Sequence, residues 1–334
     1  MRHITPGRLL ALGLVVLAIA VGLYVIPSDE YIFLPDPAHP VAPLVTVPGG
    51  HDPTNGSIYF VDIVVRKASI LEKLFGGLHK GAQLFPASAV NPPGVGDRQR
   101  RQIDLQDMRT SQQVAAAVAL RAAGRKVVMT STGARIALVD PDLPAAGKLD
   151  PGDVITAVGG TPVHDIEDIS AAMRKHKPGD VVAFTDRRGT QTSVVRIKTV
   201  RNPLPPHNAI VGVQLENQLD IHLPLDVRID AGNVGGPSAG LAFALEVLAE
   251  LGRNVLHGHK IAATGEIFAN GAVGPIGGIE QKTIGARDAG VDAFLVPAGE
   301  NAQEARKHAD GLRIIPVETF PQALHALATL PSRP

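Results

Sequence analysis

Residues 230–251 read DAGNVGGPSAGLAFALEVLAEL, a glycine-rich loop that leads into an apolar stretch at Leu241–Leu251. The pattern predicts a helix that begins just after Ser238. Unpaired backbone N–H groups and the positive end of the helix dipole would then lie beside the Ser238 hydroxyl, where they can stabilise an oxyanion. Serine is also a favoured helix N-cap, so the loop alone leaves both roles open. A catalytic role for this serine needs a base.

A candidate base lies in the segment GPIGGIEQKTIGARDAG at 274–290, which predicts a helix over 279–289. At about 100° per residue, Lys282 falls on the apolar arc of this helix, whereas Gln281 and Asp288 fall on the other side. Burial disfavours the charged form of a lysine, which lowers its pKa and lets the neutral amine accept a proton. The alternative is a lysine whose stem packs while its amine reaches water.

Three further segments predict elements around these two helices. SIYFVDIVV at 57–65 is rich in β-branched and aromatic residues, as strands are. Residues 104–123 carry apolar side chains at helical spacing. The dipeptide Asn270-Gly271, which lies between two apolar runs, predicts a β-hairpin. Strands and helices together indicate an α+β fold.

Residues 126–199 change to short strands (KVVM, RIALV, DVITAV, VVAFTD and SVVRIK) around one helix at Ile166–His176, with Asp165 as its cap. The stretch PAAGKLDPGDVITAVGGT at 144–161 resembles PDZ domains, which bind an extended peptide as an added strand. STGAR at 131–135 is a loose match to the loop that holds the peptide carboxylate. The resemblance implies a peptide-binding module, and a module that only packs against its neighbour is the alternative.

Three motifs in order along the chain resemble the proteolytic domain of the Lon protease family, with its Ser-Lys dyad. They are GGPSAG at 235–240, TGEI at 264–267 and the segment at 274–290. By that resemblance Ser238 matches the nucleophile and Lys282 matches the lysine of the dyad. The similarity runs from about residue 208 to 330.

The same resemblance implies supporting residues. Thr264 matches a threonine near the lysine, and Gly236 and Pro237 are expected to orient the turn or to contribute to the oxyanion site. Gly235 occupies the position at which many Lon proteases carry an aspartate. Any regulatory role of that aspartate is therefore not expected in this chain. Neither a cofactor nor a metal ion is expected.

The first residues predict a membrane anchor. Leu9–Ile26 holds eighteen residues without a charge, enough for a helix of roughly 27 Å. Arg8 precedes this run and Asp29 follows it, so the positive-inside rule predicts a cytoplasmic N-terminus and a catalytic domain outside the cytoplasmic membrane. A signal peptide cleaved near 18–20 and a buried core helix are the alternatives.

These patterns divide the chain into four predicted parts. The strand at 57–65 and the helix around 111–123 look similar to the opening elements of a Lon proteolytic domain, which would make the PDZ module an insertion within it. A separate small subdomain is the alternative. The predicted parts are an anchor at 1–27, a tether plus the first part of the proteolytic domain at 28–123, a PDZ domain at 124–200 and a Lon-like domain at 205–330.

The composition of the chain excludes some classes of binding partner and of chemistry. Lys plus Arg and Asp plus Glu both total 32, so no net charge draws the chain to nucleic acid. Cysteine is absent, which excludes disulfides and a thiol nucleophile. No G-x-x-x-x-G-K-[ST] phosphate loop occurs in the 334 residues, so ATP dependence is not carried over from Lon proteases.

The sequence therefore predicts an ATP-independent serine endopeptidase for unfolded or flexible protein segments, acting in protein quality control. Its expected partners are polypeptide substrates, a peptide ligand of the PDZ module and the lipid bilayer at residues 9–26; assembly of several copies is left open. A catalytically inactive membrane PDZ scaffold is one alternative. The other is an α/β-hydrolase-type esterase, because 236–240 also fits G-x-S-x-G. That reading lacks a clear catalytic histidine among His257, His259, His308 and His325.

Overall fold

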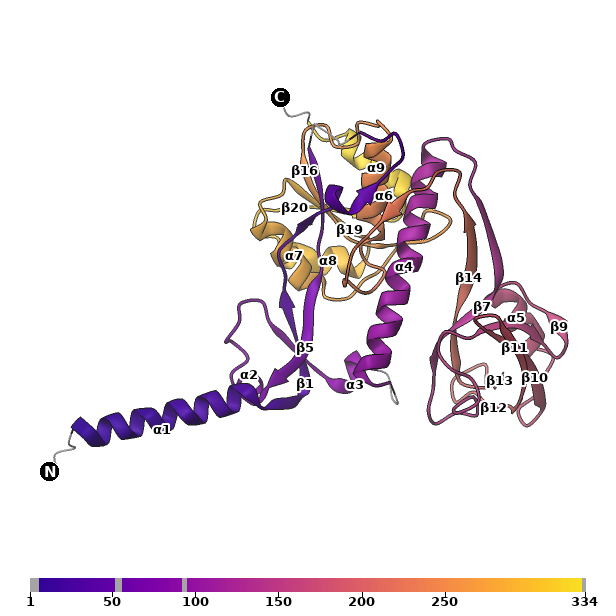
Figure 1. Cartoon of the computed structure of the whole chain (residues 1–334), viewed down its shortest axis with the longest axis horizontal. Helices are drawn as coiled ribbons and strands as arrows, with labels where there is room; N and C mark the ends of the chain where they lie inside the picture. Colours follow the sequence, from indigo (N-terminus) through magenta and orange to yellow (C-terminus); the bar gives the residue numbers. More distant parts are fainter. Residues whose placement is uncertain (1–5, 52–55, 92–94, 332–334) are drawn as a thin grey trace.

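The N-terminal helix projects away from the rest of the chain (Figure 1). The computed structural model describes residues 6–51, 56–91 and 95–331, and this helix, α1, spans Pro6–Val25. Within those ranges, no helix is both long and apolar enough to cross a membrane. The anchor predicted over Leu9–Ile26 is therefore not supported, and the Leu9 side chain lies outside the described residues.

Structure forms where the sequence predicted an extended tether. β1 is the central strand of an antiparallel sheet between β5 and β6. The prediction fails because a segment rich in proline still folds when its apolar side chains reach a core, as those of Ile32 and Val41 do. The elements of this region are β1 (Pro27–Pro35), β5 (Ile63–Ser69), α2 (Ile70–Leu74), β6 (Gln83–Pro86) and α3 (Ala87–Val90).

A five-stranded sheet lies at the centre of the largest core, in the order β2-β4-β16-β19-β20. The last four strands run parallel to one another, and β2 is antiparallel to β4. The strands are β2 (His39–Pro40), β4 (Ser57–Phe60), β16 (Lys260–Ala263), β19 (Ala293–Pro297) and β20 (Arg313–Val317). The strand predicted over 57–65 is thus two strands, β4 and β5, in different sheets, because the chain leaves the parallel sheet after Phe60.

Helices cover both faces of this sheet. Side chains alternate along β16, so Ile261 and Ala263 enter one core and Ala262 the other. The first core is covered by α4, α6 and α9, and the second by α7 and α8. The helices are α4 (Asp97–Ala122), α6 (Gly240–Glu250), α7 (Ile279–Asp288), α8 (Glu300–Lys307) and α9 (Phe320–Ala328). The fold is a mixed α/β one, because a parallel sheet with helices on both faces lies beside antiparallel sheets.

The first core also joins distant parts of the sequence. β4 and α4 precede the segment predicted as a PDZ module, yet β4 pairs with β16 and α4 packs along α6. α4 begins at Asp97, earlier than the predicted start at 104, and lies between the parallel sheet and the module in Figure 1.

The predicted PDZ module is an antiparallel sheet with one helix, α5 (Ile166–Met173). The carboxylate of Asp165 accepts a hydrogen bond from the N–H of Asp168 at 2.8 Å, which confirms the predicted cap. Strand order is β11-β10-β8-β7-β14, with β9 beside β8. The strands are β7 (Val128–Val139), β8 (Val154–Val158), β9 (Thr161–Pro162), β10 (Val181–Arg188), β11 (Gln191–Lys198) and β14 (Val213–His222).

The STGAR segment is strand and not a loop. Ser131 pairs with Leu219, and Ala134 pairs with Asn217, so the segment lies inside β7 against β14. It cannot form the carboxylate-binding loop that the sequence suggested. The chain after residue 200 instead supplies the last strand of this sheet.

Short paired strands complete the connections. The β17–β18 pair confirms the hairpin predicted at Asn270-Gly271, where Gly271 has a φ of 82°. The other pairs are antiparallel as well. The elements are η1 (Ala42–Leu44), β3 (Val45–Thr46) with β15 (Arg228–Ile229), β12 (Val200–Arg201) with β13 (Ala209–Ile210), and β17 (Glu266–Ile267) with β18 (Val273–Gly274).

Candidate active site

Ser238 lies in the turn that leads into α6. The helix begins at Gly240 and Ala239 is its N-cap residue, with no side-chain cap. The Ser238 Oγ instead lies 2.6 Å from Nζ of Lys282, so the N-cap alternative is wrong for this serine. Among the described residues, the N–H groups of Ser238 and Ala239 donate no hydrogen bond. They are therefore available at the positive end of α6.

Residues of α4 hold this turn in place. The N–H of Gly236 donates to the carbonyl of Asp104 at 2.7 Å, and the hydroxyl of Ser111 donates to the carbonyl of Pro237 at 2.9 Å. A Cβ on Gly240 would lie 2.7 Å from Ser111 Oγ, so only glycine allows this approach. Because the Gly236 N–H is occupied and proline has none, these two predicted site residues position the turn without offering a donor to an oxyanion.

Asp104 and Ser111 were missed by the sequence reasoning. No motif marks either residue, and Ser111 lies 126 positions before Pro237. One signal was present, since Ser111 occupies a buried position, 4% exposed, on a helix whose other buried residues are apolar. A buried serine on an apolar face needs a hydrogen-bond partner outside the face.

Lys282 confirms the prediction that it lies on the buried side of its helix. The residue is only 3% exposed, on the first turns of α7. Burial lowers the pKa of Lys282 to about 8, and the carboxylate of Asp62 partly opposes this shift. The alternative of an amine that reaches water is wrong, because Nζ contacts Ser238.

The other side of α7 is more covered than the sequence suggested. Asp288 is exposed, but Gln281 is fully buried and its Nε2 donates to the carbonyl of Gly81 at 2.9 Å. A Cβ on Gly285 would lie 2.2 Å from the carbonyl oxygen of Asp36, so glycine lets the segment after β1 cross the helix. The prediction for Gln281 failed because the N-terminal sheet is a second packing partner of α7.

Thr264 contacts both members of the candidate dyad. Its Oγ1 accepts from Lys282 Nζ at 3.4 Å and donates to the carbonyl of Ser238 at 3.1 Å. The N–H of Gly265 donates to the same carbonyl at 2.7 Å. These contacts tie the serine to the end of β16 and place the threonine near the lysine, as the resemblance implied.

Asp62, another residue that no motif marked, belongs to a small charged cluster close to Lys282. Its pKa is raised by burial and by the neighbouring Asp36, while His39 and Lys282 act in the opposite direction. His39 Nε2 lies 3.1 Å from Asp36 and 3.5 Å from Asp62. Ligating atoms of these three residues lie within 4.8 Å of one another, as do those of Glu280, Glu304 and His308. Histidine–carboxylate contacts account for both groups, and neither indicates a metal site on its own.

The esterase alternative is not supported by the contacts of the serine. In the described part of the chain, no histidine hydrogen-bonds to Ser238. His259 lies against the carbonyl of Pro331 at 2.6 Å, and His308 against Glu304 at 3.1 Å. A serine beside a buried amine, with unpaired N–H groups close by, is instead suited to acyl transfer with lysine as base.

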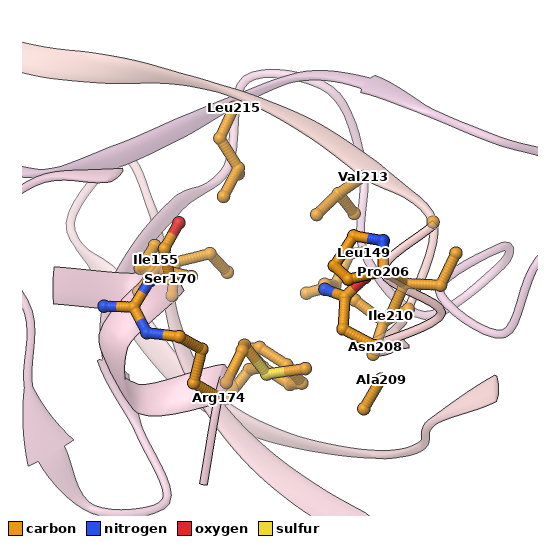
Figure 2. Close-up of a pocket in the computed structure, with 15 residues that line it drawn as sticks. Leu149, Ile155, Ser170, Arg174, Pro206, Asn208, Ala209, Ile210, Val213 and Leu215 are labelled. Carbon is orange, nitrogen blue, oxygen red and sulfur yellow. The ribbon is translucent and has the colours of Figure 1, made fainter. Parts of the chain in front are cut away.

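A groove of about 380 Å³ lies between α5 and the start of β14. Figure 2 shows Ser170 of α5 and Arg174, the residue just after this helix, on one side and Val213 of β14 on the other, with apolar side chains between them. Among the described residues, β14 is the last strand of its sheet and one of its edges pairs with no other strand. One wall of this groove comes from residues beyond 200, outside the segment that the sequence assigned to the PDZ module.

Two protein families match this chain. Residues 194–329 match the Lon protease (S16) C-terminal proteolytic domain. This part of the chain is therefore similar to a Lon-type proteolytic domain. Residues 122–199 match a PDZ domain. Ser238, Thr264 and Lys282 all lie inside the Lon-type match, which supports a serine protease function.

Curated relatives carry the same name. Lon protease 2 of Bacillus subtilis is 31% identical over 155 residues, which are 45% of this chain and 27% of that protein. Lon protease of Clostridium beijerinckii is 38% identical over 117 residues, 33% of this chain and 14% of that protein. The chain thus spans about a quarter or less of the length of these relatives.

Solved PDZ domains are similar to a small part of the chain. The PDZ domain of an SdrC-like protein from Listeria monocytogenes is 26% identical, covers 26% of this chain and 90% of that chain, and has a TM-score of 0.24. The PDZ domain of an SdrC-like protein from Listeria innocua is 24% identical, covers 26% of this chain and 96% of that chain, and also has a TM-score of 0.24.

Proposed function

We propose that this protein is a serine endopeptidase in which Ser238 is the nucleophile and Lys282 the general base. The 2.6 Å contact between Nζ and Oγ, at a lysine that is 3% exposed, carries the proposal. A lysine pKa of about 8 leaves part of the amine neutral near neutral pH, and only the neutral amine can accept a proton.

The geometry supports a two-step acyl transfer. Lys282 takes the proton of Ser238 as Oγ attacks the scissile carbonyl carbon, and the N–H groups at the start of α6 stabilise the resulting oxyanion. The lysine ammonium then protonates the leaving amine as the C–N bond breaks, which leaves an ester on Oγ. Water hydrolyses this ester with Lys282 again as base, and the serine regains its proton. Thr264 keeps Nζ oriented by accepting its hydrogen bond.

We further propose that the substrates are unfolded or flexible segments cleaved without ATP, in the service of protein quality control. The purified full chain in mild detergent is expected to cleave unfolded casein at the same rate with ATP, without nucleotide and with EDTA, because its 334 residues contain no phosphate loop. Release of acid-soluble peptides measures the rate. No cleavage in any condition would contradict the endopeptidase, and a strict nucleotide requirement would contradict the ATP independence.

We infer that the groove beside α5 binds an extended peptide as an added strand on β14. Its support is the free edge of β14, the apolar lining and the PDZ match. Met173→Glu, which puts a charge into the groove, is expected to abolish enrichment of peptides from a displayed random library. Lys175→Glu, at an exposed position just past α5, should enrich peptides as the unchanged chain does. Equal enrichment by both variants would argue against this groove.

We also propose that the chain sits in the cytoplasmic membrane with its catalytic domain on the outer side. Support comes from the charge-free run at 9–26, with Arg8 before it and Asp29 after it. Protease added to intact spheroplasts is expected to digest the body of the protein, which immunoblotting would follow. Full protection of the body would contradict this topology.

A further inference from the structure

A cavity of about 560 Å³ lies beside the turn that carries Ser238. Its walls come from α4, from β14 and from the β17–β18 hairpin. Pro237 lines it and directly precedes the nucleophile. Glu266 also lines it and follows Gly265, whose N–H bonds to the Ser238 carbonyl. The cavity therefore lies where a substrate side chain near the scissile bond would enter.

The cavity is lined by more acidic than basic side chains. Arg135 of β7 is 7% exposed, and its guanidinium donates to Asp107 of α4 at 2.8 Å and to Glu216 of β14. Both of those carboxylates thus share one cation. Within the described residues, the third carboxyl, that of Glu266, has no hydrogen-bond or ion-pair partner. Three acids against one guanidinium leave the cavity negative, with Glu266 as the acid that lacks a cation.

Apolar side chains make up most of the rest of the lining, beside the polar residues Thr110, Ser111, Asn217 and Asn270. Aliphatic and aromatic side chains come from α4, α5, β14, β17 and the turn after β17. The cavity therefore combines apolar walls with the unpaired carboxyl group of Glu266. Lysine and arginine have that same character, with an apolar stem and a charged head. The apolar wall consists of Val114, Ile166, Leu215, Leu219, Ile267 and Phe268.

The titration of Glu266 is consistent with a missing cation. Burial raises the pKa of Glu266 to about 7, and the negative charges of Glu216 and Asp107 add to the shift. An ammonium or guanidinium inside the cavity would relieve both the desolvation and the repulsion. The free carboxylate is thus an energetically unfavourable group that a basic side chain would stabilise.

We propose that this cavity is a specificity subsite, in which Glu266 pairs with a lysine or arginine side chain of the substrate close to the scissile bond. The inference rests on the proposed endopeptidase function and adds a substrate class to it. Cleavage is therefore favoured in basic segments of unfolded chains, at a fixed distance from the bond that is cut.

Internally quenched peptides test this subsite. One lysine is moved along an otherwise neutral sequence, and a matched set carries norleucine, which has a similar stem and no charge. At pH 8.5 we expect one position at which the lysine peptide exceeds the norleucine peptide in kcat/KM by about tenfold or more. This ratio should fall to about one in Glu266→Gln, whereas Glu266→Lys should favour glutamate at the same position. Glu300→Gln, at the exposed first position of α8, should keep the wild-type ratio.

Binding separates this inference from the proposed function. Fluorescence anisotropy with the Ser238→Ala chain should show tighter binding of the best lysine peptide than of its norleucine match. Equal binding and equal kcat/KM at every position would overturn the subsite. Lysine-dependent binding without any cleavage by the unchanged chain would overturn the endopeptidase and keep the subsite. Lowering the pH below about 7 should reduce the binding preference, because Glu266, facing Asp107, Glu216 and Arg135, then becomes protonated.

Discussion

Ser238→Ala and Lys282→Met are each expected to lower the rate of casein cleavage by about 10⁴-fold or more, and the double variant no further. The losses should not add, because nucleophile and base act as one unit across the 2.6 Å contact. Methionine has nearly the length of lysine and no charge to desolvate, so the Lys282→Met chain should unfold at a temperature no lower than that of the unchanged protein. Thermal unfolding followed by circular dichroism measures this.

Lys260→Met provides the matched control. Lys260 is exposed on β16 in the same domain, so the same chemical change should leave casein cleavage unaltered there. A folded Lys282→Met protein that still cleaves would remove lysine as the base. A Ser238→Ala protein with substantial activity would contradict the whole mechanism. If the unchanged chain showed no activity at all, that result would favour the alternative of an inactive scaffold.

The rate of cleavage of a neutral peptide is expected to rise with pH through about 8 and then level off. Only the amine form of Lys282 accepts the serine proton, and burial lowers the pKa of this lysine to about 8. Between pH 8 and pH 6 the neutral fraction falls about 50-fold, so kcat/KM should fall by the same factor. The neutral norleucine peptide is the right substrate, because it does not depend on the charge of Glu266.

Asp62→Asn tests the cause of this profile. The Asp62 carboxylate favours the ammonium form of Lys282, so its removal should lower the lysine pKa and move the rising limb to lower pH. Asp288→Asn, on the exposed side of α7, should leave the limb in place. A profile that is flat between pH 6 and pH 9 would contradict Lys282 as the titrating base.

Local patterns were sufficient for some features and misleading for others. Lys282 was placed correctly because its spacing relative to the apolar residues of α7 decides which side it takes. Gln281, on the same helix, was placed wrongly because the N-terminal sheet covers a second side that no local pattern reveals. The tether prediction failed for a similar reason. Proline and glycine content describes the chain locally, whereas burial of Ile32 and Val41 depends on surfaces supplied by other segments.

Membrane insertion, the domain limits and the catalytic roles remain predictions. The membrane proposal rests on the charge pattern around residues 9–26, and the dyad proposal rests on the contact between Ser238 and Lys282. The match to a Lon-type proteolytic domain at 194–329 supports a protease, whereas the assignment of each role rests on the contacts around Ser238.

The sequence by itself singled out the two side chains that we propose carry the chemistry, Ser238 and Lys282. A glycine-rich turn before an apolar helix and a lysine on an apolar arc are local patterns, and local backbone and burial preferences suffice to produce them. Only the tertiary structure decided that Ser238 and Lys282, 44 positions apart, meet at 2.6 Å, and that Ser111 holds the turn from 126 positions away. It also decided that Glu266 lines a cavity whose one guanidinium among the described residues, that of Arg135, pairs with Asp107 and Glu216 instead. These contacts depend on the packing free energy of segments distant in sequence, which no single segment specifies.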